Sequence, residues 1–179
     1  CMIVKDESTV IERCLRSVLP FLDAWTVVDT GSSDNTVELV ESILGHLPGQ
    51  VHCRPWRNFG DNRTEAFELN RQLGDYHLVI DADDWLETSS DWSLPELWAD
   101  VYELTVHHGG ILYRRPQMFR TGLDWEFVGV LHEYAHCPQA RSASWLEGLE
   151  YQNSGGQGAR SRNPEKYQQD AAVLREAVL

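Results

Sequence analysis

Along the first half of the chain, short apolar runs alternate with segments in which apolar residues recur at helical spacing. The apolar runs predict four strands, at residues 1–4, 25–28, 50–56 and 77–80. The segments between them predict three helices, at residues 10–19, 37–47 and 62–73. Strands and helices that alternate in this order are typical of a parallel sheet with right-handed crossovers, so we expect an α/β fold.

Polar residues near the helix starts predict caps. Thr9 and Glu12 have the spacing of a capping box, and Pro20 ends the first helix. Asp34 or Ser33 could cap the second helix, for which a turn or cap role is the simplest interpretation of Asp34. The third helix is expected to be capped by Asp61 and stopped by Gly74.

The second half of the chain follows a different pattern. It contains one predicted helix, at residues 94–99, and two predicted strands, at 101–107 and 111–119. The two strands are joined at 108–110, which predicts an antiparallel hairpin, and residues 125–131 follow. A glycine-rich loop at 154–161 precedes a final helix, which Asn163 could cap and which includes Leu174 and Val178. We expect a single domain over residues 1–179, with a boundary between its halves at residues 87–88.

Composition limits the class of partner. At 179 residues the chain is long enough to bury a core, and its formal charge of −13 argues against nucleic acid as the main partner. A small anionic ligand stays compatible with this charge if a metal ion supplies positive charge. No apolar run approaches the roughly 18 residues that span a bilayer, and no signal peptide is visible.

The cysteines and the first residues bear on compartment and completeness. Cys1, Cys14, Cys53 and Cys137 lack the C-x-x-C spacing, which indicates reduced, largely buried thiols in a cytoplasmic protein. Distant pairs could still form disulfides. Because the sequence opens inside a predicted strand, we expect a fragment trimmed at its N-terminus, and a lost targeting segment stays open.

Three carboxylates, those of Asp81, Asp83 and Asp84, follow the fourth predicted strand. Like charges this close raise one another's pKa unless a positive charge lies among them, and a hard divalent cation is a usual partner. The alternative is a simple acidic turn. Since ligands bind at the carboxyl ends of strands in open α/β sheets, we expect four loops to gather there, at residues 5–7, 29–34, 56–63 and 81–84.

Four motifs in this order suggest a family. They are M-I-V-K-D-E at 2–7, V-V-D-T-G-S-S-D-N-T at 27–36, F-G-D-N-R-T-E-A-F at 59–67 and V-I-D-A-D-D at 79–84. Together they resemble family 2 glycosyltransferases of the GT-A type. The later G-V-L-H-E-Y and G-G-Q-G-A-R-S resemble a subgroup whose catalytic domain is often followed by tetratricopeptide-type helical repeats, so a downstream helical-repeat domain is expected.

The resemblance implies a GT-A fold, in which a Rossmann-like, mostly parallel sheet is flanked by helices and joined to a smaller antiparallel region. Residues 1–87 would form the nucleotide-sugar-binding half and residues 88–179 the acceptor-side half. The implied activity is a metal-dependent, inverting transfer from a nucleoside diphosphate sugar, with UDP-sugar as the donor and Mn²⁺ or Mg²⁺ at the diphosphate. The acceptor is a glycan, a peptide or protein, or a small molecule.

The resemblance also implies roles for particular residues. The expected metal ligands are Asp83, Asp81 and His132. The expected contacts to the nucleotide sugar are Val4, Lys5, Glu7, Asp29, Arg63, Asp81 and Arg160. Glu133 is the expected general base, with Asp124 as the reserve candidate. Thr30 stands where many relatives have a second acid, which leaves the choice of uridine open.

Other interpretations of the same residues stay open. Residues 132–136 spell H-E-x-x-H, a zinc-hydrolase motif when it lies on a helix, although Cys137 and Pro138 would end such a helix at once. Asp29 could serve only in a turn, and His132 with Glu133 could be a surface pair. Of the tryptophans beside the site loops, we expect one or two to face the site. The alternatives for the whole chain are a nucleotidyltransferase and a catalytically silent nucleotide- or sugar-binding module.

Overall fold

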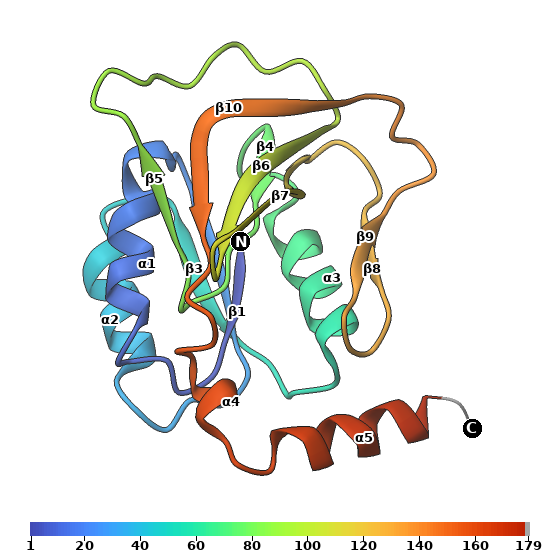
Figure 1. The fold of residues 1–179 in the computed structure, drawn as a ribbon. Coiled ribbons are helices and arrows are strands. Elements are labelled where there is room, and N and C mark those ends of the chain that lie inside the picture. Colours follow the sequence, from blue (N-terminus) through green and yellow to red (C-terminus); the bar gives the residue numbers. More distant parts are fainter. Residues whose placement is uncertain (178–179) are drawn as a thin grey trace.

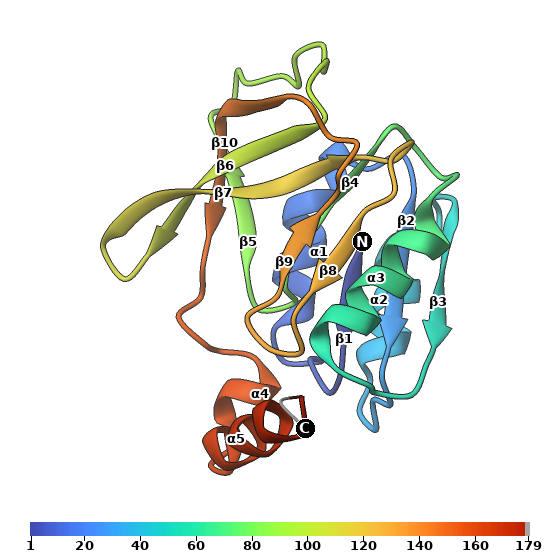
Figure 2. The same cartoon turned by 90° about the vertical axis from the view of Figure 1, so that its right-hand side faces the viewer.

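A three-stranded parallel sheet flanked by helices forms one part of the molecule (Figure 1). The computed structural model describes residues 1–177 and confirms the α/β fold class. The strands of this sheet, in spatial order, are β1 (Met2–Val4), β2 (Trp25–Asp29) and β3 (Gly49–Cys53). The connecting helices are α1 (Ile11–Val18), the short η1 (Leu19–Phe21), α2 (Thr36–Leu44) and α3 (Phe59–Asn70). Helices α1 and α2 cover one face of the sheet and α3 covers the other (Figures 1 and 2).

A mixed five-stranded sheet forms the other part. In spatial order its strands are β4 (Tyr76–Leu78), β7 (Ile111–Arg120), β6 (Val101–His108), β10 (Ala143–Gln152) and β5 (Trp85–Thr88). Strands β6 and β10 pair in parallel, and the other three pairs are antiparallel. The remaining elements are the β8 (Glu126–Val128) and β9 (Tyr134–His136) hairpin, α4 (Ala159–Arg162) and α5 (Lys166–Glu176).

The fourth strand differs from the expectation of a purely parallel ladder. Strand β4 pairs antiparallel with β7, while the terminal amine of Cys1 donates a hydrogen bond to the Leu78 carbonyl at 2.9 Å. The pattern at residues 77–80 identifies a buried strand, but the periodicity of one strand does not specify its hydrogen-bonded neighbour. The fourth strand therefore links the two sheets.

The helix predicted at 94–99 is wrong. This segment has no helical hydrogen bonding, and Leu94 and Trp98 are exposed instead of forming the buried face that their spacing suggested. Its other apolar side chains do not form one continuous face, because Ala99 is fully buried in the main core and Leu97 is only partly buried against it.

Two of the predicted caps are also wrong. The capping box predicted for Thr9 and Glu12 is not made: helix α1 has no side-chain cap hydrogen bond, and Glu12 pairs with Arg16 at 2.8 Å. Helix α3 begins one turn earlier than expected, since the Asn58 side chain accepts the Asp61 N–H at 2.8 Å. Asp34 makes the local turn contact that was expected, since its carboxylate accepts the backbone N–H of Thr36 at 3.0 Å, but the N-cap residue of α2 is Asn35.

Several further expectations can be checked in the described part of the chain. The predicted final helix is present as α5, and Val178 lies outside the described residues. All four cysteines are free thiols, and Cys14 and Cys137 are buried. None of the helices within residues 1–177 has both the length and the apolar character that a membrane crossing requires.

Helix α3 packs unusually close to the chain that follows β8. A Cβ atom on Gly60 would lie 2.4 Å from the Gly129 carbonyl oxygen and 2.8 Å from that of Phe127. The contact is reinforced by the Phe127 N–H, which donates to the Thr64 hydroxyl at 2.8 Å. A second core cluster, which includes Phe67 and Phe119, also lies between α3 and the mixed sheet. The absence of a side chain at residue 60 thus fixes the distance between α3 and the β8–β9 hairpin.

We expect Gly60→Ala to lower the free energy of unfolding by about 1–3 kcal/mol, because the added methyl group meets backbone atoms that cannot rotate away. Helix propensity alone predicts the opposite sign, a gain of up to about 1 kcal/mol. Urea denaturation would measure the change. Gly74→Ala is the matched control, since its Cβ would meet nothing within 4 Å. A Gly60→Ala protein as stable as the wild type would contradict the close-packing explanation.

Candidate active site

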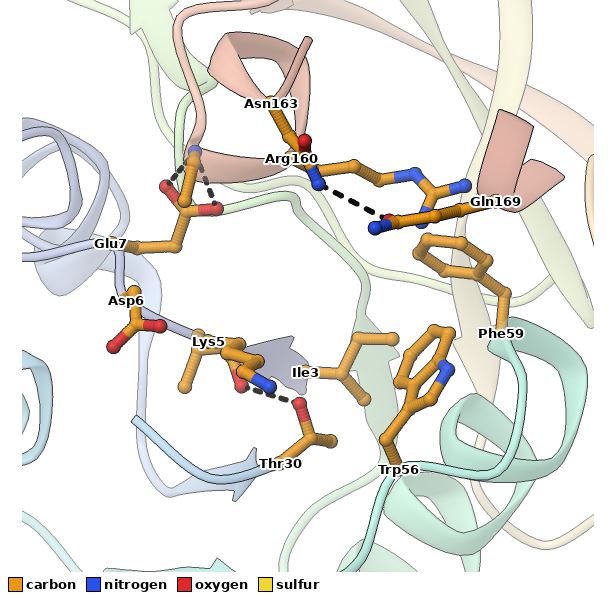
Figure 3. A pocket seen from close by; sticks show the side chains of 12 residues that line it. Ile3, Lys5, Asp6, Glu7, Thr30, Trp56, Phe59, Arg160, Asn163 and Gln169 are labelled. Atoms are coloured by element: carbon orange, nitrogen blue, oxygen red, sulfur yellow. Dashed lines mark hydrogen bonds between the residues drawn. The ribbon is translucent and has the colours of Figure 1, made fainter. Parts of the chain in front are cut away.

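A first pocket, which we call pocket A, lies at the carboxyl ends of the parallel strands (Figure 3). It has a volume of about 400 Å³. The end of β1 and the start of α3 form its walls, and α4 and α5 contribute the opposite side. Its lining residues are Ile3, Val4, Lys5, Asp6, Glu7, Thr30, Trp56, Phe59, Ala159, Arg160, Asn163 and Gln169. The expectation that the strand-end loops gather in one place is met for the loops after β1, β2 and β3, the second of which contributes Thr30.

Four of the predicted nucleotide-sugar contacts line pocket A: Val4, Lys5, Glu7 and Arg160. The Arg160 guanidinium lies 4.6 Å from the centre of the Phe59 ring and is ion-paired with Asp170. Figure 3 shows Phe59 and Trp56 side by side on one wall. Pocket A therefore has an aromatic wall, formed by Trp56 and Phe59, and a cation from the C-terminal segment, Arg160.

Asp29 is placed differently from the other predicted contacts. Its side chain is buried, and its carboxylate accepts the backbone N–H groups of Gly31 and Ser32 at 3.1–3.2 Å. The neighbouring Thr30, not Asp29, lines pocket A. These hydrogen bonds stabilise the turn after β2, which is the role that the alternative interpretation gave to Asp29. A contact from Asp29 to a ligand stays a prediction.

The start of α4 lies between two acids from distant parts of the chain. Ala159 donates its N–H to both carboxylate oxygens of Glu7, at 3.1 and 3.0 Å. Gly158 donates its N–H to Oδ2 of Asp83 at 2.8 Å, and the Ser154 hydroxyl donates to the same oxygen at 2.6 Å. A Cβ on residue 158 would lie 3.1 Å from Glu7 and 3.2 Å from Asp83, so glycine suits this position.

Among the acids that line pocket A, Glu7 has a pKa well above its ordinary value. Burial raises its pKa from the ordinary 4.5 to about 7; the hydrogen bond from Ala159 opposes this shift, and repulsion from Asp83 adds to it. Asp83 and Glu7 thus form a pair of acids at the edge of the pocket, in which Glu7 keeps its proton up to a pH of about 7.

Asp84 joins the turn at residues 81–84, which we call the acidic turn, to the end of β10. It is 1% exposed and accepts hydrogen bonds from Tyr151 at 2.7 Å, from the Asn153 side chain at 3.1 Å and from the Ser154 N–H at 2.8 Å. Burial raises its pKa, which these hydrogen bonds partly offset. The saturation of both oxygens indicates that Asp84 holds the turn in place.

A second pocket, pocket B, lies on the other side of the acidic turn and has a volume of about 480 Å³. Arg63 lies in its wall and bridges two carboxylates. Its Nη2 donates to Asp81 at 2.5 Å, and its Nε donates to Glu133 at 2.6 Å. The side chains of Arg63 and Glu133 are only 12% and 11% exposed. Three predicted site residues from separate motifs are thus brought together.

The bridge determines the charge state of its members. Burial acts to raise the pKa of Asp81, but the Arg63 guanidinium outweighs it and holds that pKa below the ordinary value. Burial acts to lower the pKa of Arg63, and the two carboxylates outweigh it and raise that pKa. Arg63 therefore remains charged and pairs with an ionised Asp81.

The structure does not bring the other predicted residues into these pockets. His132 is exposed, with a left-handed backbone φ of 57°. Asp124 lies in a separate hollow, where it is paired with Arg71 and accepts a hydrogen bond from the Gln139 side chain at 2.7 Å. Within residues 1–177 no group of three or more His, Cys, Asp or Glu side chains is arranged to hold a metal ion, so Asp81, Asp83 and His132 do not form such a cluster.

The zinc-hydrolase alternative fails on local geometry. Its motif requires both histidines on one face of a helix. Residues Tyr134–His136 form strand β9, which pairs with β8, and no helix begins at His132.

Several lining residues were missed by the sequence analysis. Arg115 and Tyr151 line pocket B from β7 and β10, and Asn163 and Gln169 line pocket A from the C-terminal segment. No local motif identifies them, because long-range strand pairing places Arg115 and Tyr151 in the site, and the packing of the C-terminal helices places Asn163 and Gln169 there. Trp56 is one of the tryptophans expected beside the site, and it does line pocket A.

Comparisons with known proteins agree with this geometry. Residues 1–145 match the model of the family described as Glycosyl transferase family 2. The chain is 33% identical over 141 residues to a TPR repeat-containing protein of Synechococcus elongatus, which covers 74% of this chain and 34% of that protein. It is 30% identical over 128 residues to the lipopolysaccharide core biosynthesis glycosyltransferase LpsC of Rhizobium meliloti, covering 71% of this chain and 45% of that protein.

The same fold is found among solved structures. S. aureus TarS 1–349 in complex with UDP-GlcNAc aligns with a TM-score of 0.63 and 16% identity, over 98% of this chain and 64% of that one. The chain spans 34% and 45% of the length of the two curated relatives above.

The raised pKa of Glu7 predicts a pH-dependent loss of stability. Between pH 4.5 and about 7 the folded state keeps a proton on Glu7 that the unfolded chain releases. The stabilisation that this proton gives the folded state is therefore fully present below pH 4.5 and is lost as the pH rises through about 7. The Glu7→Gln variant has no carboxyl group at this position and does not titrate. We expect the difference in free energy of unfolding between variant and wild type to move in favour of the variant across this window.

Urea denaturation at a series of pH values in metal-free buffer would measure this difference. Glu147→Gln, an exposed position on β10, controls for the removal of one negative charge. A difference between Glu7→Gln and the wild type that stays constant from pH 4.5 to 7 would show that Glu7 titrates normally.

Proposed function

Because this chain belongs to glycosyltransferase family 2, we propose that it is the catalytic domain of a metal-dependent, inverting glycosyltransferase with a UDP-sugar donor. The observation that supports this best is the position of the acidic turn between the two pockets. Asp83 lies beside the Glu7 and Ala159 wall of pocket A, and Asp81 lines pocket B. A donor in pocket A and an acceptor in pocket B would meet at this turn.

We assign the nucleotide to pocket A. A volume of about 400 Å³ lies in the range of small-ligand sites. Trp56 and Phe59 would provide apolar faces for the base, the backbone at Val4 and Lys5 would line the opposite wall, and Arg160 would bind the diphosphate. The TarS structures with UDP and with UDP-GlcNAc support the choice of uridine.

The residues at the acidic turn fit a metal ion that is shared with the donor phosphates. Both hydrogen bonds that Asp83 accepts within residues 1–177 end on Oδ2, so Oδ1 could bind a cation. A Mg²⁺ site of this kind uses one or two carboxylates together with substrate phosphates, and does not need a cage of protein ligands. Asp83 is therefore the main proposed ligand, while Asp81 is engaged by Arg63 and His132 is exposed. The ion, Mn²⁺ or Mg²⁺, would stabilise negative charge on the departing diphosphate.

We assign the role of general base to Glu133 in pocket B. In an inverting transfer the acceptor oxygen forms a bond to the anomeric carbon while the bond to the phosphate oxygen breaks, and its electron pair leaves with UDP. The acceptor proton would pass to the Glu133 carboxylate. Arg63 fixes the orientation of this carboxylate through Oε1. Asp124, in its separate hollow, is the reserve candidate.

Two further features of the full-length protein belong to the proposal. The S. elongatus relative is named for TPR repeats, and we propose a helical-repeat domain downstream of this one. The proposed acceptor, bound in pocket B, is a glycan, a peptide or protein, or a small molecule.

We expect Asp83→Asn to reduce the Mn²⁺-dependent part of the affinity for UDP by at least about tenfold, because an amide oxygen is a much weaker ligand for a hard cation than a carboxylate. Titration calorimetry with UDP, with and without Mn²⁺, would measure it. Asp91→Asn makes the same charge change at an exposed loop position and serves as the control. An unchanged response to Mn²⁺ would remove Asp83 from the metal site.

We expect Glu133→Gln to bind UDP normally and to lose transfer by a factor of about 10²–10⁴, the usual contribution of a general base. Single-turnover assays with a panel of UDP-sugars and acceptors would measure this factor. Glu126→Gln, an exposed position on β8, is the matched control. Retained turnover would move the base to another residue, first to Asp124. UDP binding by a wild-type chain that transfers no sugar would instead favour the silent binding module.

A further inference from the structure

One cation in pocket B is not used by the proposed reaction. Arg115 lies on β7, and its guanidinium is 4.7 Å from the centre of the Tyr151 ring. Its Nε atom is buried and has no hydrogen-bond partner among residues 1–177. The other arginine of the pocket, Arg63, donates through Nε and Nη2 to two carboxylates.

A buried N–H without a partner is costly, because it has lost water and gained nothing in return. Because the Arg115 side chain lines pocket B, an oxygen of a ligand bound there can become a partner of its guanidinium. A guanidinium presents its N–H groups in a planar fork that matches carboxylate and phosphate oxygens, and hydrogen bonds of this kind are stronger than neutral ones. The unfilled bonding capacity of Arg115 therefore indicates an anionic group on the occupant of pocket B.

The pocket supports this assignment in two further ways. Asp81 and Glu133 both hydrogen-bond to Arg63, and Arg115, although close enough to Asp81 to lower the pKa of its carboxyl, has no Nε hydrogen bond to either of them. The remaining wall is largely apolar and includes the aromatic rings of Phe119, Phe127 and Tyr134. Aromatic faces pack against the apolar C–H faces of sugar rings.

We propose that Arg115 recognises an anionic group, a carboxylate or a phosphate, on a sugar acceptor bound in pocket B. The inference rests on the proposed function, since it takes pocket B as the acceptor site beside Glu133. Arg115 is then a specificity-determining residue that selects sugar acids or sugar phosphates over neutral sugars. It touches the acceptor away from the hydroxyl group that reacts.

The adjacent residue offers a matched control. Arg114 is exposed, and its guanidinium lies 4.0 Å from the centre of the Trp145 ring, outside pocket B. Successive side chains of a strand point to opposite faces, so the two arginines belong to different environments. Arg114→Gln and Arg115→Gln thus make the same chemical change one position apart.

The test uses the chain saturated with UDP and Mg²⁺, titrated with glucuronate, glucose 6-phosphate or glucose. The ¹⁵N–¹H spectrum of the arginine Nε–H groups would be recorded, and the Arg115 signal identified by its absence in Arg115→Lys. We expect this signal to move with one or both anionic probes and not with glucose. We expect the preferred anionic probe to bind at least about tenfold more tightly than glucose. Whether glucuronate or glucose 6-phosphate is preferred distinguishes a carboxylate from a phosphate.

The variants decide whether the preference depends on the guanidinium. Arg115→Gln should abolish the preference for the anionic probe, Arg115→Lys should keep part of it through its charge, and Arg114→Gln should keep all of it. Equal affinities for all three probes, or a preference that survives in both Arg115 variants, would overturn the inference while the measured binding of UDP leaves the proposed function standing. A wild-type chain that does not bind UDP would overturn both.

Discussion

The bridge from Arg63 to Asp81 and Glu133 is the interaction on which the arrangement of the site depends. It joins α3, the turn after β4 and the loop before β9, which belong to separate parts of the fold. Removal of one partner from a buried ion pair leaves an uncompensated charge, and this costs more than the pair itself contributes. The three elements are therefore kept in register by charge as well as by packing, and the close approach of Gly60 to Gly129 allows the short ion-pair distances to form.

The acidic turn shows how one short segment serves two pockets. Asp81 is ion-paired with an arginine, Asp83 accepts hydrogen bonds from a hydroxyl and a main-chain N–H, and Asp84 accepts them from donors at the end of β10. Three carboxylates that would repel one another in isolation thus have three different sets of partners. This division explains why the pKa of Asp81 is lowered while that of Asp84 is raised, although only two residues separate them.

Much of the first half of the fold could be predicted from sequence, because its signals are local. Apolar runs identified β1 and β2, and helical spacing identified α1 and α2. The partner of β4 could not be predicted, since strand pairing depends on residues some 40 positions away. The helix at 94–99 was wrongly predicted because Leu94 and Trp98 are exposed while Leu97 and Ala99 contact the core, so the segment buries no continuous helical face.

The same distinction holds for the site. Glu7, Arg63, Asp81 and Glu133 could be predicted because each lies in a recognisable motif, but no motif shows that one arginine binds two of them. The unpaired Nε of Arg115 is a property of packing between β7 and β10, and it has no sequence signature.

The C-terminal segment has a further consequence for how ligands reach pocket A. Helices α4 and α5 have no buried residues, yet they form one side of the pocket, and the start of α4 is held by hydrogen bonds to Glu7 and Asp83. A segment held mainly by hydrogen bonds at its first residues can detach at a small fraction of the free energy of global unfolding. Residues 154–177 are thus the least stable part of the wall of pocket A. A nucleotide can therefore enter and leave by local opening of this segment while the sheets and their cores remain folded.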